Sequence, residues 1–221
     1  MRAPQGCKNS PLYLRILMDK LFAPLAEYLI WYADDVLIST SGSFEEHLKI
    51  LEKVMIILKE GGLKIRAEKV DIAKDSIEFL GLIWTKGTMT IPEAKVHAIK
   101  TLPSPKTQKQ LKSYICMMSY YRSFIPRFAH LMTELNELTL SHHKTFKWTE
   151  EYEQKFRTLI QALCDNTKLY LPEASETFYV QTDASKTCCG GKIFQKINGE
   201  ERLVAAISRT FTKTERNYST F

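Results

Sequence analysis

No stretch of the 221-residue chain is apolar for long enough to cross a membrane, and its start does not resemble a signal peptide. A membrane span needs roughly 18 or more consecutive apolar residues, and a secretory leader combines a basic start with an apolar segment. These absences predict an intracellular protein of the cytoplasm or nucleus, with no membrane partner.

Cysteine is scarce and irregularly placed. The five residues are odd in number, contain no Cys-x-x-Cys spacing, and lie at Cys7, Cys116, Cys164, Cys188 and Cys189. Neither a disulfide framework nor a cysteine-based metal site is expected from this pattern. No internal repeat or low-complexity run is visible either, so free thiols in a reducing compartment and an ordinary globular organisation are predicted.

Charge is modestly unbalanced toward the basic side. Lysine and arginine number 31 against 25 acidic residues, giving a net charge of +6 and a sequence pI of about 9.0. This excess is compatible with a phosphate-backbone partner but does not require one.

Residues 29–39 (LIWYADDVLIS) place two adjacent carboxylates between two apolar runs. Both runs are rich in β-branched and aromatic residues and predict strands. Asp34 and Asp35 therefore lie at the tip of a predicted hairpin. Two neighbouring carboxylates repel each other, and a divalent cation with a preference for oxygen ligands, such as Mg²⁺, relieves this repulsion. A solvated turn is the simpler alternative, because Asp is common in hairpin loops.

Turn and helix signals along the first part of the chain predict an α+β fold. Ser10-Pro11 begins a predicted helix that Pro24 should end. A capping box at Ser43 and Glu46 begins a second, with Leu48, Leu51, Met55 and Leu58 as its expected apolar stripe. Residues 76–83 and 88–91 are predicted to be strands joined by a turn at Lys86-Gly87.

The pattern becomes helical after Pro92 and returns to strands after Pro172. Helices are predicted over about 107–121, 127–140 and 149–164, and strands over 177–182, 191–195 and 201–207. Three domains follow, spanning residues 1–92, 93–171 and 172–221.

The order of motifs resembles one family. PQG-x-KNSP is followed by YADD, GLKI-x-x-EK, IEFLG, LKSY, YYRSFIPRF, FKWTEE and TDAS. This succession is similar to the pol polyprotein of gypsy-type LTR retrotransposons, from the middle of the reverse transcriptase palm to the start of ribonuclease H. The resemblance implies a partial palm with an antiparallel sheet, a helical thumb or connection, and a partial ribonuclease H-like α/β domain.

The resemblance also implies the roles of residues in the palm. Asp34 and Asp35 would bind Mg²⁺, or Mn²⁺ as the alternative ion, with Asp34 favoured as the direct ligand. Tyr32 would line the site near the primer end, and Gln5 and Gly6 would pack under the template–nucleotide pair. The reaction would be metal-assisted transfer of a nucleotide from a dNTP to a primer.

Two further segments would bind substrate. Lys69 matches a segment that faces the incoming triphosphate, with a solvated surface lysine as the alternative. Phe79, Leu80 and Gly81 resemble the primer grip, a hairpin that positions the primer backbone.

The helical segment resembles a thumb that follows the template–primer minor groove. Its basic residues, which can neutralise phosphates without reading sequence, are Lys106, Lys109, Lys112, Arg122 and Arg127. The interleaved aromatic residues Tyr114, Tyr120, Tyr121 and Phe124 are interpreted as core rather than as base-stacking platforms.

Asp183 matches the first metal-binding carboxylate of ribonuclease H, a two-metal nuclease. The palm strand that carries a further metal-binding Asp in this family is not among these residues, nor is the helix with the ribonuclease H Glu, to which Glu215 does not correspond. The isolated chain is therefore expected to be inactive as polymerase and nuclease. The alternatives are a non-catalytic nucleic-acid-binding remnant or co-opted retroelement protein, and a remnant without a ligand. Self-association is left open.

Overall fold

The computed structural model describes residues 8–139 and 146–218. The chain divides into two compact units, Met1–Phe79 and Leu80–Phe221. The α-helices are α1 (Ser10–Phe22), α2 (Phe44–Glu60), α3 (Glu93–Lys100), α4 (Gln108–Tyr120), α5 (Phe128–Glu137) and α6 (Glu150–Asp165). The short 3₁₀ turns are η1 (Ala23–Leu25), η2 (Ala67–Lys69), η3 (Arg122–Phe124) and η4 (Glu215–Asn217).

The strands form antiparallel pairs in both units. They are β1 (Leu29–Tyr32), β2 (Asp35–Ile38), β3 (Ser76–Phe79), β4 (Leu82–Thr85), β5 (Thr88–Thr90), β6 (Lys168–Tyr170), β7 (Phe178–Ala184), β8 (Cys188–Ile197) and β9 (Glu200–Thr210). This mixture confirms the predicted α+β class. Within the described ranges, no helix is long and apolar enough to span a membrane.

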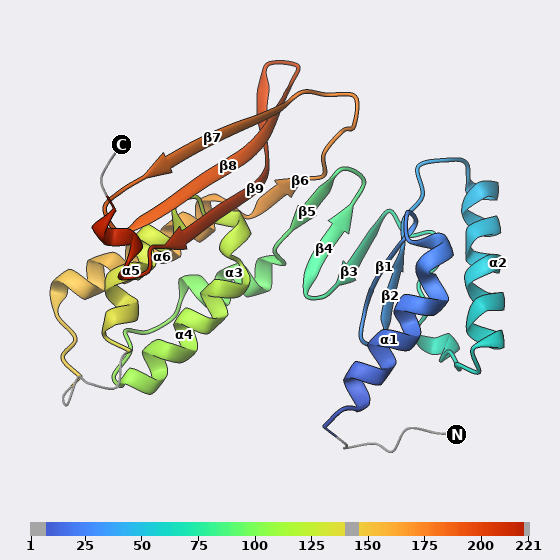
Figure 1. The fold of residues 1–221 in the computed structure, drawn as a ribbon, viewed down its shortest axis with the longest axis horizontal. Helices are drawn as coiled ribbons and strands as arrows, with labels where there is room; N and C mark the ends of the chain where they lie inside the picture. The colour runs from blue at the N-terminus through green and yellow to red at the C-terminus, as the bar shows by residue number, and fades with distance from the viewer. Residues whose placement is uncertain (1–7, 140–145, 219–221) are drawn as a thin grey trace. The chain divides into compact units, whose positions relative to one another are not determined.

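The first unit is built on α1, α2 and the β1–β2 hairpin (Figure 1). Its buried core consists of Met18, Phe22, Leu25, Leu29, Val54 and Leu58. Helix α1 begins at Ser10 with Asn9 at the N-cap, one residue earlier than the sequence predicts. Helix α2 has the predicted capping box, since Glu46 N–H donates to Ser43 Oγ at 3.3 Å and Ser43 N–H donates to Glu46 Oε2 at 2.7 Å.

The predicted apolar stripe of α2 is only partly correct. Leu58 is buried, but Leu48 and Met55 are exposed, and Val54 is buried in their place. This helix carries apolar residues on more than one face, so their spacing alone does not decide which face is buried. Packing against α1 buries the face that carries Val54.

The predicted strand over residues 76–83 is interrupted. Strand β3 ends at Phe79 and β4 begins at Leu82, because Leu80 and Gly81 both adopt positive φ angles of 50° and 70°. Two consecutive left-handed residues form a tight reversal. The compact units also divide here, whereas the three predicted domains, with boundaries near residues 92 and 172, remain a prediction.

The second unit has a core of helices packed on strands. Tyr121 and Phe124 lie in this core, as predicted, and Tyr114 stacks on Phe156 with a ring-centroid distance of 5.8 Å. Helix α4 begins as expected, with Gln110 N–H donating to Thr107 Oγ1 at 3.2 Å. Strand β5 pairs with both β4 and β6, a return to the sheet that the sequence did not predict.

Strands β7, β8 and β9 form a three-stranded antiparallel sheet, with α5 against one face (Figure 1). All three strands were predicted and are longer than expected. The register places Asp183, Gly190 and Ser208 in one row across the sheet. Residues paired across strands point to the same face, so this row faces α5.

Ser208 joins the helices to this sheet. Its Oγ accepts a hydrogen bond of 2.9 Å from the backbone N–H of Ala129, the second residue of α5, and the contact is buried. Its backbone carbonyl accepts a hydrogen bond from Arg122, whose guanidinium also lies over the Phe128 ring. A hydroxyl about eighty positions along the chain therefore satisfies a helix N-terminal donor that an N-cap side chain usually serves.

Glu215 is held in a local network at the end of the second unit. Its carboxylate accepts two hydrogen bonds from Arg209, at 2.8 and 2.9 Å, and one of 2.7 Å from Thr212 N–H. The Arg209 hydrogen bonds and those from Thr212 lower the pKa of Glu215 to about 2. The carboxylate of Glu215 is therefore engaged within its own turn.

Replacing Ser208 with Ala should destabilise the second unit by about 0.5–2 kcal/mol, since it removes a cap and leaves the Ala129 N–H buried without this partner. Urea unfolding followed by circular dichroism measures the change. The control is Ser39→Ala at an exposed serine of the first unit. An S208A chain as stable as the control would contradict the structural role.

Stability at low pH should depend on Glu215. The folded pKa of about 2 is below the ordinary value of 4.5, so the charged carboxylate stabilises the fold above pH 4.5, and this contribution is lost as the pH falls toward 2. The stability difference between wild type and E215Q should therefore shrink over that range, and the Thr212 amide resonance should titrate with a midpoint near 2. A midpoint near 4.5 would contradict the pairing with Arg209.

Candidate functional site

The β1–β2 hairpin presents the two predicted metal-site carboxylates at its tip. Tyr32 pairs with Asp35, so Ala33 and Asp34 form a two-residue loop. Ala33 adopts a φ of 53°, a left-handed conformation that is uncommon outside glycine and that occurs preferentially at functional sites. The predicted position at a hairpin tip is confirmed.

The hairpin is anchored at Trp31, one residue before the pair that closes its open tip. Trp31 packs on Phe22 of α1, with ring centroids 5.6 Å apart, and its Nε1–H donates to Asp19 Oδ1 at 2.9 Å. Asp34 and Asp35 are exposed, and so is Tyr32, at 65%. The two carboxylates and the tyrosine are thus exposed to solvent on a hairpin that is anchored to α1.

The donor chemistry at this tip fits a hard divalent cation in part. Mg²⁺ is commonly held by one or two carboxylates together with substrate phosphates, and Asp34 and Asp35 provide two. Among the residues that the structure describes, however, no group of three or more His, Cys, Asp or Glu side chains could hold a metal. The hairpin therefore supplies ligands but not a complete metal cage.

The other predicted palm residues have different surroundings. Gln5 and Gly6 lie outside the described residues. Lys69 is exposed at the end of η2, and Phe79 is buried at the end of β3. Their proposed roles toward nucleotide and primer remain predictions.

The Leu80–Gly81 turn is held by two side chains whose contacts with it the sequence did not predict. Tyr120 of α4 donates its hydroxyl hydrogen to the Leu80 carbonyl, and Lys95 Nζ of α3 donates to the Gly81 carbonyl at 2.9 Å. Spacing alone gave no signal for these contacts, because they join residues 40 and 14 positions apart. Tyr120 is 55% exposed, so its interpretation as a core residue was wrong.

The predicted phosphate-binding residues fall into two groups. Lys106, Lys109 and Lys112 are exposed at the start of α4 and along it. Arg122 is bonded to the Ser208 carbonyl, and Arg127 pairs with Asp183. The lysines are thus accessible at the surface, whereas the two arginines have hydrogen-bond partners within the second unit.

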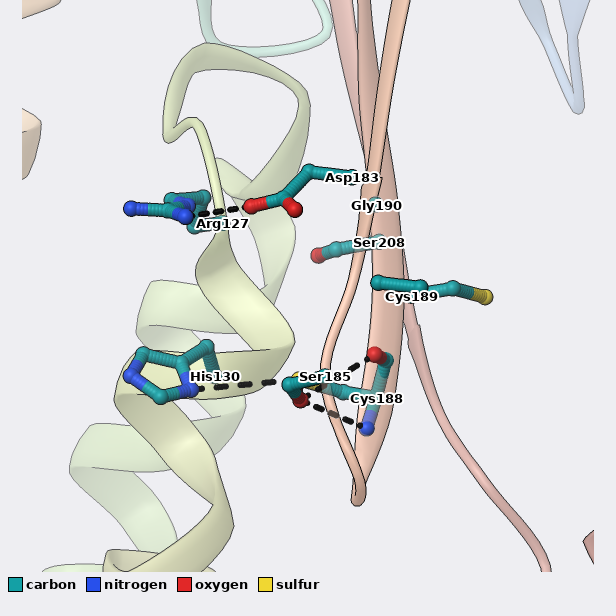
Figure 2. A pocket seen from close by; sticks show the side chains of 9 residues that line it. Arg127, His130, Asp183, Ser185, Cys188, Cys189, Gly190 and Ser208 are labelled. Atoms are coloured by element: carbon teal, nitrogen blue, oxygen red, sulfur yellow. Dashed lines mark hydrogen bonds and ion pairs between the residues drawn. The ribbon is translucent and has the colours of Figure 1, made fainter. Parts of the chain in front are cut away.

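Asp183 lies within β7 and faces the start of α5, where it pairs with Arg127 (Figure 2). Arg127 is the N-cap of α5 and has a φ of 59°, a left-handed conformation. The hydrogen bond from Arg127 and its positive charge lower the pKa of Asp183 below the ordinary value. Both side chains are more than half exposed, so the pair contributes little to stability.

The pocket around this pair is small and offers a mixed set of groups. It has a volume of about 70 Å³ and is lined by Arg127, His130, Asp183, Ala184, Ser185, Cys188, Cys189, Gly190 and Ser208. Figure 2 shows Ser185 at the turn after β7, where its Oγ accepts a 3.2 Å hydrogen bond from Cys188 N–H. Cys188 Sγ lies 3.9 Å from His130 Nδ1.

The residues around Asp183 do not fit a two-metal centre. Asp183 is the sole carboxylate among the residues that line this described pocket, and its oxygen is engaged by Arg127. A two-metal site needs several carboxylate ligands that bridge or flank the ions. The role of Asp183 as a metal ligand remains a prediction, and the residues that line this pocket offer no second carboxylate to share an ion with it.

Two family models match this chain. The model for reverse transcriptase (RNA-dependent DNA polymerase) matches residues 1–84, and the model for the RNase H-like domain found in reverse transcriptase matches residues 148–221.

Curated relatives match essentially the whole chain. The retrovirus-related Pol polyproteins from the Drosophila melanogaster transposons opus and gypsy are 32% and 31% identical, over 100% and 99% of the chain. The chain spans 23% and 22% of their lengths, so it corresponds to less than a quarter of each.

Solved structures share the fold. The foamy viral protease-reverse transcriptase in complex with dsDNA matches 99% of the chain and 45% of its own length, with 28% identity and a TM-score of 0.77. The same viral protein in complex with an RNA/DNA hybrid matches with 27% identity and a TM-score of 0.79, over 99% of the chain and 29% of its own length. Together with the order of motifs, these matches identify the chain as the reverse transcriptase and RNase H-like region of a retroelement Pol polyprotein.

Proposed function

We propose that this chain carries part of the nucleotidyltransferase site of an RNA-directed DNA polymerase and binds a template–primer duplex. The observation that supports this most directly is the exposed Asp34–Asp35 pair at the tip of an anchored hairpin, inside the segment that matches reverse transcriptase. In the intact parent, the substrates would be a dNTP and a primer on an RNA or DNA template.

The hairpin residues would bind the metal ion and line the position of the primer end. A bound Mg²⁺ supplies charge stabilisation at the attacking and leaving oxygens in phosphoryl transfer. Asp34 and Asp35 would provide its oxygen ligands, and the rigid hairpin would hold them in place. Tyr32, exposed beside them, would line the position of the primer end.

Duplex binding would rest on the exposed lysines. Phosphate contacts give affinity without sequence preference, and Lys106, Lys109 and Lys112 lie on the accessible surface of the second unit. The foamy viral relatives were solved with dsDNA and with an RNA/DNA hybrid, which supports a duplex as the partner. Arg122 and Arg127 are assigned a smaller part, because their guanidinium groups already have partners within the chain.

The isolated chain would lack both activities. Within the described ranges no group of three or more potential metal ligands is present, and Asp183 is paired with Arg127. No nuclease step is therefore placed at Asp183. These same observations favour the second candidate function, a non-catalytic protein that binds nucleic acid.

Primer extension on an RNA template, with Mg²⁺ or Mn²⁺, should yield no product above background for the isolated chain. Asp34→Asn is the matched control, since it removes one charge and keeps the shape of the side chain. Extension by the wild type that is lost in D34N would overturn the expected inactivity and would assign catalysis to this hairpin.

The same variant separates a metal-binding hairpin from a solvated turn. Mn²⁺ should broaden the Ala33 and Asp35 amide resonances of the wild type, and this broadening should fall severalfold in D34N because one of two oxygen ligands is lost. Asp75→Asn, at an exposed Asp of the same unit, should leave the broadening unchanged. Equal broadening in D34N and wild type would show that Asp34 is not a ligand.

Each lysine that contacts phosphate should change the salt dependence of duplex binding. Lys109→Gln and Lys112→Gln should each weaken binding of a primer–template duplex and reduce the slope of log K against log salt by about one. Fluorescence anisotropy at several salt concentrations measures both quantities. Lys53→Gln, at an exposed lysine of α2, is the charge-matched comparison, and an equal loss in all three variants would indicate only a general charge effect.

A further inference from the structure

The Leu80–Gly81 turn has a backbone conformation that needs support. Both residues have positive φ angles, 50° and 70°, and for leucine this left-handed conformation is strained. Leu80 and Gly81 lie between two strands, so their carbonyls are outside the strand pairing. A turn of this kind keeps one geometry only when surrounding groups fix it.

Two helices of the second unit supply that support. Tyr120, at the end of α4, donates to the Leu80 carbonyl, and Lys95, in α3, donates to the Gly81 carbonyl at 2.9 Å. The Tyr120 ring is itself set by an edge-to-face contact with buried Tyr121, with ring centroids 5.0 Å apart. Consecutive carbonyls of one turn are thus held by donors from two separate helices.

Glycine at position 81 suits this arrangement on two counts. Its φ of 70° disfavours any residue with a side chain, and a Cβ built at this position would lie 2.8 Å from Lys95 Nζ. An alanine here would both strain the backbone and push the lysine from its hydrogen bond. The absence of a side chain at residue 81 therefore leaves room for Lys95 Nζ beside the turn.

We propose that Lys95 and Tyr120 are positioning residues that fix the Leu80–Gly81 turn in the form that meets the backbone of a template–primer duplex. This inference rests on the proposed function, since it takes the duplex as the ligand of the turn. Lys95 acts through its hydrogen bond to Gly81 and not as a phosphate-binding charge, because its Nζ donates to the turn and the residue is partly buried. The two donors fix the backbone conformation of the turn, and the turn itself contacts the duplex.

The hydrogen bond itself is tested in the free chain by carbonyl-¹³C labelling of glycine. Lys95→Met should shift the Gly81 carbonyl resonance toward that of a carbonyl bonded to water, and Lys95→Arg, which keeps a charged donor, should restore it. Lys86→Met removes a charge from the neighbouring β4–β5 turn, where Lys86 is exposed, and should leave the resonance in place. An unchanged Gly81 carbonyl resonance in K95M would contradict the hydrogen bond from Lys95.

The effect on the ligand is tested by duplex affinity in the same variants. K95M and Tyr120→Phe should each raise the Kd for a primer–template duplex by about three- to tenfold, because a hydrogen bond that orders the contact is lost. The salt slope should stay unchanged, whereas loss of a phosphate contact would lower it by about one. K95R should recover most of the affinity.

The outcomes distinguish this inference from the proposed function. A wild-type chain that binds no duplex would overturn both. Tight wild-type binding that K95M leaves unaltered, or weakens together with a lower salt slope, would overturn the positioning role alone. A weaker K95M with an unchanged slope and rescue by arginine would support it.

Discussion

Left-handed backbone at single positions is the constraint on which the candidate sites of this protein depend. Ala33 turns the hairpin that carries Asp34 and Asp35, Leu80 begins the turn held by Lys95, and Arg127 starts α5. None of the three is glycine, so each conformation must be maintained by its surroundings. The contacts of Trp31 with α1 support the first, the two donors to residues 80–81 support the second, and the packing of α5 on the sheet supports the third. Where function is proposed, the fold holds a conformation that the local sequence would not choose.

The basic side chains of the second unit divide by chemistry. Arginine has a planar group with several donors and suits fixed geometries, whereas lysine is a strongly hydrated point charge on a flexible stem. Accordingly, Arg122 and Arg127 bond to Ser208 and Asp183, which join the helices to the β7–β9 sheet. Lys109 and Lys112 stay exposed. The number of basic side chains thus overstates how many are free to contact a nucleic acid, because Arg122 and Arg127 already have partners within the fold.

The surroundings of Asp183 differ from those that its motif predicts. The residue stands in the expected strand and faces the pocket, yet the pocket supplies a guanidinium instead of further carboxylates. An exposed ion pair of this kind is weak, so the absence of carboxylate partners among the lining residues matters more than the competition from Arg127. The same reasoning applies at the tip of the β1–β2 hairpin, where Asp34 and Asp35 are accessible but provide two carboxylate ligands alone.

Local chemistry made much of this protein predictable from its sequence. The capping signals at Ser43 and Thr107, the hairpin around Asp34 and Asp35, and the three final strands depend on residues close together in the chain, and all are observed. Tertiary packing decided the rest. It selected Val54 over Met55 as the buried residue of α2, broke the predicted strand at Leu80, and brought Lys95, Tyr120 and Ser208 to partners 14 to 79 residues away. Hydrogen bonds between distant residues leave no periodic trace in a sequence, because their geometry exists only once the helices and sheets have packed together.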